Sequence, residues 1–289
     1  MLARLGILFS AVFAGGCTIH QGRPGTPPPP PTHSDYRITR DVSFSPPDWP
    51  QELKADIYQP KGRGPFPAVL VLYGGGWEHG DRRQLSSIAR DLARRGYVAV
   101  ASTYRLAPAY IFPAQLRDVQ LAVRWMRAQA ADYRIDGTRI GVWGYSAGAH
   151  LAALLGGIGP GDALFDPDAR VGAVVAGGTP SDLTKFPGGT LVPQFIGGPR
   201  SEKLAEYKAA SPISYVSAGD PPVFLYHGGM DRLVPPDHAT DYKAMLDAAG
   251  VPAELVILRG RGHITAFLTD GAAVKAGLVF LDRHLRDRQ

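Results

Sequence analysis

Six uninterrupted apolar runs most constrain what this chain can fold into. Within each run, apolar residues do not alternate with polar ones as they do in a half-exposed strand. Strands that are apolar on both faces are typical of a parallel sheet covered by helices. The runs are residues 68–73, 97–101, 140–143, 171–176, 223–226 and 255–258.

Segments with helical periodicity separate these runs. Gly96 and Gly250 follow two of them, at the position where helices commonly end. The alternation predicts a doubly wound α/β domain with a mostly parallel sheet flanked by helices. Alternating patterns over residues 36–44 and 53–58 predict a leading hairpin or meander. The expected helices are residues 84–95, 114–131, 147–155, 236–249 and 266–285.

Residues 1–17 are typical of an export signal. Arg4 supplies a positive charge, and the apolar run 5–14 is too short to span a bilayer. Small residues then precede Cys17, an arrangement that resembles a bacterial lipobox, although Ala14 stands where that motif usually has leucine. We therefore predict an exported cell-envelope lipoprotein, in the periplasm or outer membrane, with lipid on Cys17. An ordinary secretory signal cleaved nearby, and hence a secreted protein, is the alternative.

Residues 18–34 have the composition of a linker. They are rich in Gly, Pro and Thr, with five consecutive prolines at 27–31. Because proline runs adopt an extended conformation without a core, this segment predicts a spacer between the anchor and a folded domain. A disordered tail without a role is the alternative. The folded domain is expected over residues 35–289, without repeats or a second domain.

Charge and cysteine content exclude several classes of protein. The net charge is +5 over 289 residues, but the basic residues are dispersed and mixed with acidic ones, so no nucleic-acid partner is expected. The single cysteine excludes an intrachain disulfide and a cysteine-based metal site. Histidines and carboxylates do not cluster at ligand spacing, so we expect no metal and no other cofactor. The membrane is expected as a partner only through the lipid anchor, and the sequence does not indicate an oligomeric state.

Residues 144–148, Gly-Tyr-Ser-Ala-Gly, lie between a predicted strand and a predicted helix. A serine between two glycines at such a junction is typical of a nucleophile elbow, in which larger flanking residues would clash. The following helix directs its positive N-terminus, and the amide of Ala147, toward an oxyanion forming near Ser146. Since the chain contains 35 glycines, the pentapeptide alone is moderate evidence.

Complementary residues follow three other predicted strands. Function in open parallel sheets is located at the carboxyl ends of the strands. Glycines 74–76 follow the first run and would let backbone amides approach a ligand, as an oxyanion hole requires. Asp231 follows the fifth run, and His263 lies on a predicted flexible loop after the last. The order Ser146, Asp231, His263 is the hydrolase order for this kind of sheet, with Asp182 as the reserve acid.

These motifs together resemble those of α/β-hydrolases of the carboxylesterase kind, close to the hormone-sensitive-lipase-like and acetyl-esterase-like (BD-FAE-like) branches. The resemblance covers roughly residues 53–285. Residues 73–77, Tyr-Gly-Gly-Gly-Trp, are similar to the family's His-Gly-Gly-Gly-Trp, so Tyr73 departs from the pattern. The other matching segments are Tyr104-Arg105-Leu106-Ala107-Pro108, Phe112-Pro113-Ala114 with Asp118, His227-Gly228, Val234-Pro235 and Gly262-His263.

The resemblance implies residue roles. Tyr73 either braces the glycine loop or donates its hydroxyl to the oxyanion or substrate. Trp77 and Tyr145 are further candidates for substrate contact, with a packing role as the alternative for Trp77. His150 is expected to be a hydrogen-bonded core histidine, and His227 to buttress the loop that carries Asp231. The remaining roles are Ser146 as nucleophile, His263 as general base then acid, Asp231 as orienting carboxylate, and the amides of Gly75, Gly76 and Ala147 as oxyanion-hole donors.

A serine carboxylesterase acting through an acyl-enzyme is the implied function. The long Gly- and Pro-rich segment 177–220 predicts a lid or substrate-binding loop. Because no amphipathic lid is recognisable, we expect an open site for short, acetyl-like acyl groups on a small-molecule or carbohydrate-linked alcohol. Two alternatives stay open: an amide hydrolase (formamidase or peptidase) with the same triad, and an inactive surface-anchored binding protein on the same fold.

Overall fold

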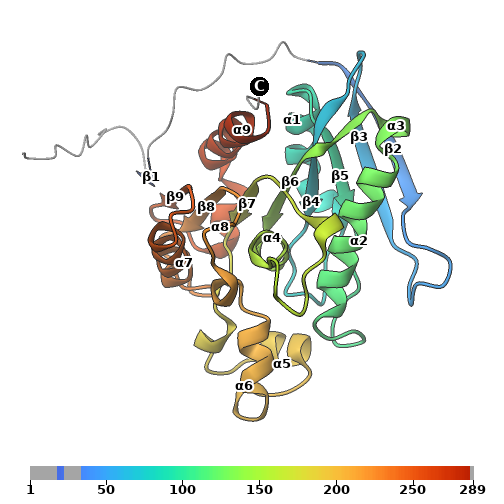
Figure 1. The fold of residues 1–289 in the computed structure, drawn as a ribbon. Coiled ribbons are helices and arrows are strands. Elements are labelled where there is room, and N and C mark those ends of the chain that lie inside the picture. The colour runs from blue at the N-terminus through green and yellow to red at the C-terminus, as the bar shows by residue number, and fades with distance from the viewer. Residues whose placement is uncertain (1–17, 23–33, 287–289) are drawn as a thin grey trace, which may run out of the picture.

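The computed structural model describes residues 18–22 and 34–286, in which one nine-stranded sheet forms the centre of the fold (Figure 1). The strand order is β1-β9-β8-β7-β6-β4-β5-β3-β2. Strands β4 to β9 pair in parallel, whereas β1, β2 and β3 pair antiparallel with their neighbours. The strands are β1 (Thr18–Gln21), β2 (Tyr36–Ser43), β3 (Lys54–Pro60), β4 (Phe66–Leu72), β5 (Val98–Ser102), β6 (Ile135–Tyr145), β7 (Val174–Gly177), β8 (Val223–Gly228) and β9 (Ala253–Leu258).

Helices cover both faces of the sheet, which confirms the predicted doubly wound α/β architecture. Buried side chains of α1 and α9 pack on one face, and those of α2, α4 and α7 on the other. None of the helices in the described ranges combines the length and hydropathy needed to cross a bilayer. The α-helices are α1 (Ser86–Arg94), α2 (Ala114–Ala128), α3 (Ala130–Tyr133), α4 (Ala147–Gly157), α5 (Leu191–Ile196), α6 (Arg200–Ala209), α7 (Asp237–Ala248), α8 (His263–Leu268) and α9 (Gly271–Leu285); short 3-10 turns are Arg82–Leu85, Pro167–Ala169, Leu183–Lys185 and Pro212–Tyr215.

Strand β4 shows why the central runs are apolar throughout. Val69 and Val71 are buried with the side chains of α1 and α9, while Leu70 and Leu72 are buried with those of α2 and α4. Successive side chains of a strand point to opposite faces, so a strand covered on both sides has no polar position. Fully burying each of these side chains stabilises the fold by about 1.5–3 kcal/mol.

The edge strand β1 corrects the predicted linker. Residues 18–21 pair antiparallel with β9, from Thr18 opposite Leu258 to Gln21 opposite Leu255. The unpaired backbone groups along the edge of β9 provide hydrogen-bond partners that local composition cannot reveal. The rest of the predicted linker over 23–33, and the predicted export signal, lie outside the described residues.

Two segments of the second half of the chain differ from their predicted secondary structure. Residues 177–220, predicted to be irregular, contain α5 and α6, which project from one end of the sheet (Figure 1). The helix predicted over 266–285 is divided into α8 and α9, since Thr269 between them has a non-helical φ of −133°. His263 therefore begins a short helix and does not lie on a flexible loop.

Candidate active site

Ser146 occupies a tight turn between β6 and α4. Its φ of 54° and ψ of −121° are in a region that L-residues rarely adopt. A Cβ on Gly144 would lie 2.2 Å from the carbonyl oxygen of Gly148, and one on Gly148 would lie 2.2 Å from that of Leu72. Neither flanking glycine can therefore carry a side chain, as expected for a nucleophile elbow.

A continuous hydrogen-bonded chain starts at this serine. Ser146 Oγ lies 2.8 Å from His263 Nε2, and His263 Nδ1 lies 2.6 Å from Asp231 Oδ2. The three residues come from the carboxyl ends of β6, β9 and β8. His263 and Asp231 are 7% and 3% exposed, so their interaction is shielded from water.

Asp231 is held in its charged form. Its Oδ1 accepts hydrogen bonds of 2.9 Å from the amides of both Leu233 and Val234. Burial by itself would raise the pKa of Asp231, but hydrogen bonds from His227, His263 and the Val234 amide lower it well below its usual range. A buried carboxylate of this kind can orient an imidazole and stabilise its protonated form.

Neighbouring residues follow the expected supporting roles. His227 Nε2 lies 2.8 Å from the carbonyl oxygen of Val234 and 3.4 Å from Asp231 Oδ2, so it buttresses the loop that carries the acid. The reserve acid, Asp182, instead caps its own turn, where its Oδ1 accepts hydrogen bonds from the hydroxyl and amide of Thr184. The structure thus joins His263 to Asp231 and not to Asp182.

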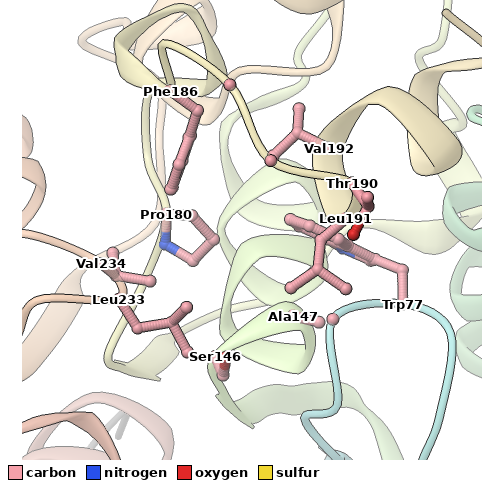
Figure 2. A pocket seen from close by; sticks show the side chains of 13 residues that line it. Trp77, Ser146, Ala147, Pro180, Phe186, Thr190, Leu191, Val192, Leu233 and Val234 are labelled. Carbon is pink, nitrogen blue, oxygen red and sulfur yellow. The ribbon is translucent and has the colours of Figure 1, made fainter.

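An apolar cavity of about 220 Å³ opens beside Ser146. Figure 2 shows Ser146 at its base, with Trp77 and Leu191 on one side and Pro180 and Leu233 on the other. Much of the wall comes from residues 180–192, within the segment predicted to bind substrate. The sequence did not identify which residues of that segment line the cavity. The lining residues are Gly76, Trp77, Ser146, Ala147, Pro180, Phe186, Gly188, Gly189, Thr190, Leu191, Val192, Leu233 and Val234.

The glycine loop and the start of α4 bring backbone amides to the cavity. Gly76 and Ala147 both line it next to Ser146, and within the described ranges their amides donate no hydrogen bond. Gly75 precedes Gly76 on the same loop, and its carbonyl accepts hydrogen bonds from the amides of Glu78 and His79; its amide, also predicted as an oxyanion-hole donor, likewise donates no hydrogen bond within the described residues. Gly75 and Gly76 have φ values of 117° and 62°, which favour glycine at both positions.

Trp77 lines the cavity and is fixed from behind. Its Nε1 donates a 3.2 Å hydrogen bond to Nδ1 of His150, and its ring stacks on Phe195 with centroids 4.4 Å apart. His150 Nε2 lies 2.7 Å from the carbonyl oxygen of Ala210, and burial lowers the pKa of His150 to about 4. His150 is therefore the hydrogen-bonded core histidine that the sequence predicted.

Tyr73 does not reach the cavity, so the expectation that its hydroxyl contacts the oxyanion or substrate is corrected. Its ring stacks on Tyr104 at 4.4 Å, and its hydroxyl lies 3.5 Å from the carbonyl oxygen of Tyr104. The Tyr104 hydroxyl donates a 2.9 Å bond to the carbonyl of Tyr73 in return. Burial raises the pKa of Tyr73 to about 12. The structure places Tyr73 in the alternative role, as a brace beneath the glycine loop.

Tyr145, also predicted as a substrate contact, does not reach the cavity either. It is 4% exposed and does not line the cavity. Its hydroxyl donates a 2.6 Å hydrogen bond to the carbonyl of His263, and its ring packs against Phe267. Tyr145 thus contacts the histidine and not the substrate side of Ser146.

The family profile named BD-FAE matches residues 55–246. The chain belongs to the BD-FAE family. The nine-stranded sheet, together with the similarity of this structure to solved esterase structures, confirms the α/β-hydrolase fold.

This BD-FAE-family chain is similar to several esterases. It is 30% identical to the probable carboxylic ester hydrolase LipM of Mycobacterium tuberculosis over 226 residues, which cover 73% of the chain and 52% of LipM. A truncated carbohydrate esterase from gut microbiota superimposes with a TM-score of 0.76 at 27% identity, covering 90% of this chain and 99% of that one. The butyrate-bound esterase Est2 of Thermogutta terrifontis gives a TM-score of 0.72 at 25% identity, with coverages of 89% and 97%. The chain spans about half the length of the curated relatives it matches.

In this BD-FAE member, the matching residues Arg105 and Asp118 hold two segments of the fold together. Asp118 accepts hydrogen bonds from the amide and guanidinium of Arg105 and from Nε1 of Trp49. These bonds tie the loop after β5 to α2. Among residues 18–22 and 34–286, no group of three or more His, Cys, Asp or Glu side chains is arranged to hold a metal ion.

Proposed function

We propose that this chain is a serine carboxylesterase that hydrolyses short-chain, acetyl-like esters through an acyl-enzyme. The observation that carries the proposal is the chain of hydrogen bonds from Ser146 through His263 to Asp231, beside an apolar cavity. A buried carboxylate, an imidazole and a strained serine in this order are the components of nucleophilic acyl transfer.

The first half-reaction follows from these contacts. His263 Nε2, 2.8 Å from the hydroxyl oxygen of Ser146, accepts the proton as that oxygen attacks the ester carbonyl. The negative charge of the tetrahedral intermediate develops beside the amides of Gly75, Gly76 and Ala147, which we assign as the oxyanion hole; Gly76 and Ala147 line the cavity itself. The imidazolium is stabilised by the Asp231 carboxylate at Nδ1.

Acylation ends when the imidazolium donates its proton to the departing alkoxide, which leaves as the alcohol while the acyl group stays on Ser146. The second half-reaction hydrolyses this acyl-enzyme. Water then loses a proton to His263 and attacks the acyl carbonyl. Return of that proton to Ser146 Oγ releases the carboxylic acid and restores the enzyme.

The size and lining of the cavity support short acyl groups. A volume of about 220 Å³ is below the range of roughly 300–1,000 Å³ that is typical for drug-sized ligands. The walls near Ser146 include the side chains of Trp77, Leu191 and Leu233, which suit a small alkyl chain. Butyrate-bound Est2 and the truncated carbohydrate esterase are consistent with a short acyl group on a small or carbohydrate-linked alcohol.

A panel of aryl esters with acyl chains from acetyl upward, together with the matching anilides, tests the proposal. We expect the highest kcat/KM for acetyl to butyryl esters, and a loss of at least about 10⁴-fold in Ser146→Ala. A preference for long acyl chains would contradict the short-chain assignment. Ser146-dependent turnover of anilides in preference to esters would favour an amide hydrolase. The absence of Ser146-dependent turnover on every substrate would favour a binding protein.

We further propose that the enzyme is exported and anchored in the cell envelope by lipid on Cys17. The proposal rests on the signal-like residues 1–17 and on the small residues before this cysteine. Metabolic labelling with a fatty-acid analogue should mark the wild-type chain and not Cys17→Ala. Labelling of both chains, or of neither, would contradict the anchor.

A further inference from the structure

The most exposed large apolar side chains of the described residues lie close to the candidate active site. Met230, Ile264 and Leu268 are 61%, 61% and 70% exposed, and Leu233 follows at 51%. All four come from the two segments that follow β8 and β9 and that carry Asp231 and His263. Single exposed apolar residues are ordinary, but a group on one face indicates an interaction surface.

These segments are hydrogen-bonded to each other. The amide of Met230 donates a 2.8 Å hydrogen bond to the carbonyl of Arg261, and the amide of Gly229 donates one of 2.9 Å to that of Leu258. Ile264 and Leu268 are four residues apart on α8 and therefore lie on the same face of that helix. We call the surface formed by Met230, Arg232, Arg259, Arg261, Ile264 and Leu268 the β8–β9 rim.

The rim carries positive charge that is not neutralised locally. Arg232 and Arg259 are exposed and Arg261 is half-buried, and within the described ranges no side-chain hydrogen bond or ion pair involves any of them. The two acidic residues of these segments are engaged inside the domain: Asp231 with His263, and Asp270 with Tyr226. Apolar side chains beside unpaired arginines are typical of surfaces that bind anionic membranes.

We propose that the β8–β9 rim docks on the surface of an anionic phospholipid bilayer. Met230, Ile264 and Leu268 would enter the headgroup region, while the arginines contact lipid phosphates. This contact is additional to the lipid expected on Cys17. The rim and the anchor lie at the same place on the domain, because Thr18 pairs with Leu258, directly before Arg259. Residues 1–17 therefore join the domain at the rim. The rim then holds the opening beside Ser146 close to the membrane.

A single fluorescent label can test this orientation. Cys17 is the one cysteine of the chain, so Cys17→Ala combined with Leu268→Cys gives a unique attachment site for a polarity-sensitive dye. The matched control is Leu204→Cys, since Leu204 is 47% exposed on α6, which Figure 1 shows apart from α8. Both chains keep residues 1–17. Because that segment joins the domain at the rim, the dependence of the shift at position 268 on the rim arginines separates docking of the rim from insertion of the segment.

On phosphatidylglycerol-containing vesicles, the dye at position 268 should shift to the blue and be protected from an aqueous quencher, and the dye at 204 should not. Phosphatidylcholine vesicles should give a much smaller response. Addition of about 0.5 M salt should weaken the shift, because it screens the arginines. Equal responses at the two positions, or no response at 268, would overturn the proposal.

Charge-removing variants test the electrostatic contribution. Replacing all three rim arginines by glutamine should weaken vesicle binding by about fivefold per arginine. A control with the same change in net charge uses three exposed basic residues from elsewhere, Arg63→Gln, Lys208→Gln and Lys275→Gln. Equal weakening by the two triple variants would mean that net charge, and not the rim, drives binding. Arginine-dependent vesicle binding without a shift of the dye at 268 would mean that the arginines attract lipid phosphates while the apolar side chains stay in water, and would also overturn the proposal.

Discussion

The hydroxyl of Tyr145 donates a 2.6 Å hydrogen bond to the main-chain carbonyl of His263. The tyrosine directly precedes Ser146, so one residue links the serine turn to the backbone of the histidine. The two rings also lie against each other, with centroids 5.4 Å apart. Because the hydroxyl does not contact the reacting atoms, we regard Tyr145 as a positioning residue.

Tyr145→Phe should lower kcat by about two- to tenfold and leave KM nearly unchanged, since it removes one hydrogen bond that holds His263 in place. The matched control is Tyr215→Phe, because the Tyr215 hydroxyl donates a similar 2.7 Å bond to the carbonyl of Ala209. Both variants should lose about 1 kcal/mol of unfolding free energy. Ester kinetics and urea denaturation measure the two effects. Equal kcat values for the two variants would contradict the positioning role.

Replacing each candidate acid separately should distinguish between them. Asp231→Asn should reduce kcat by about 10⁴-fold, since it removes the charge that orients and stabilises protonated His263. Asp182→Asn should leave kcat within about twofold, because Asp182 caps its own turn at Thr184. Steady-state kinetics of both variants on one acetyl ester provide the comparison. A larger loss in Asp182→Asn would reverse the assignment.

Asp270 should make the folded state less stable as the pH rises from about 4 to 6. Burial raises the pKa of this carboxyl to about 6, so in this window the folded state binds more protons than the unfolded state. Asp270→Asn removes that dependence. Because the site is partly exposed, the variant should exceed the wild type by about 1–2 kcal/mol at pH 8, with little difference at pH 4. Urea denaturation at the two pH values measures this, and a constant difference would argue against a raised pKa.

Leu191 should limit acyl-chain length if the proposed esterase activity holds. It lines the cavity, and a Cβ built on Gly76 would lie 2.9 Å from its Cδ2, so it packs directly on the glycine loop. Leu191→Ala should raise kcat/KM for hexanoyl relative to acetyl esters by at least about fivefold, because the space released can accept additional methylene groups. Leu204→Ala, on the exposed surface of α6, is the control and should leave the ratio unchanged.

Much of this fold and part of the candidate site could be predicted from local sequence. The apolar run at 68–73 predicted a strand covered on both faces, because the burial of alternate side chains is recorded directly in the sequence. The glycines at 144 and 148 predicted the turn at Ser146 for a comparably local reason: a side chain there would meet the backbone of the turn itself or of the adjacent β4.

Other features depend on residues that meet only after folding. Asp182 and Asp231 both follow predicted strands, and local pattern could rank but not decide between them. The sequence predicted that Tyr145 contacts the substrate. In the structure its hydroxyl donates a hydrogen bond to the carbonyl of His263, which is 118 positions away in the sequence. Residues 18–21 have the composition of a linker and still pair with β9, since the edge of that strand supplies their hydrogen bonds.

The sequence alone determined the layered α/β architecture, the strained turn at Ser146 and the identity of His263 as its partner. These properties follow from periodicity, from glycine and from the order of residues at strand ends. Only the tertiary structure decided which carboxylate holds His263, where Tyr73 and Tyr145 point, and that the exposed apolar residues and arginines share one rim. Distances of 2.6 and 2.8 Å between groups more than 30 positions apart are set by how β6, β8 and β9 pack, and no local pattern encodes that packing.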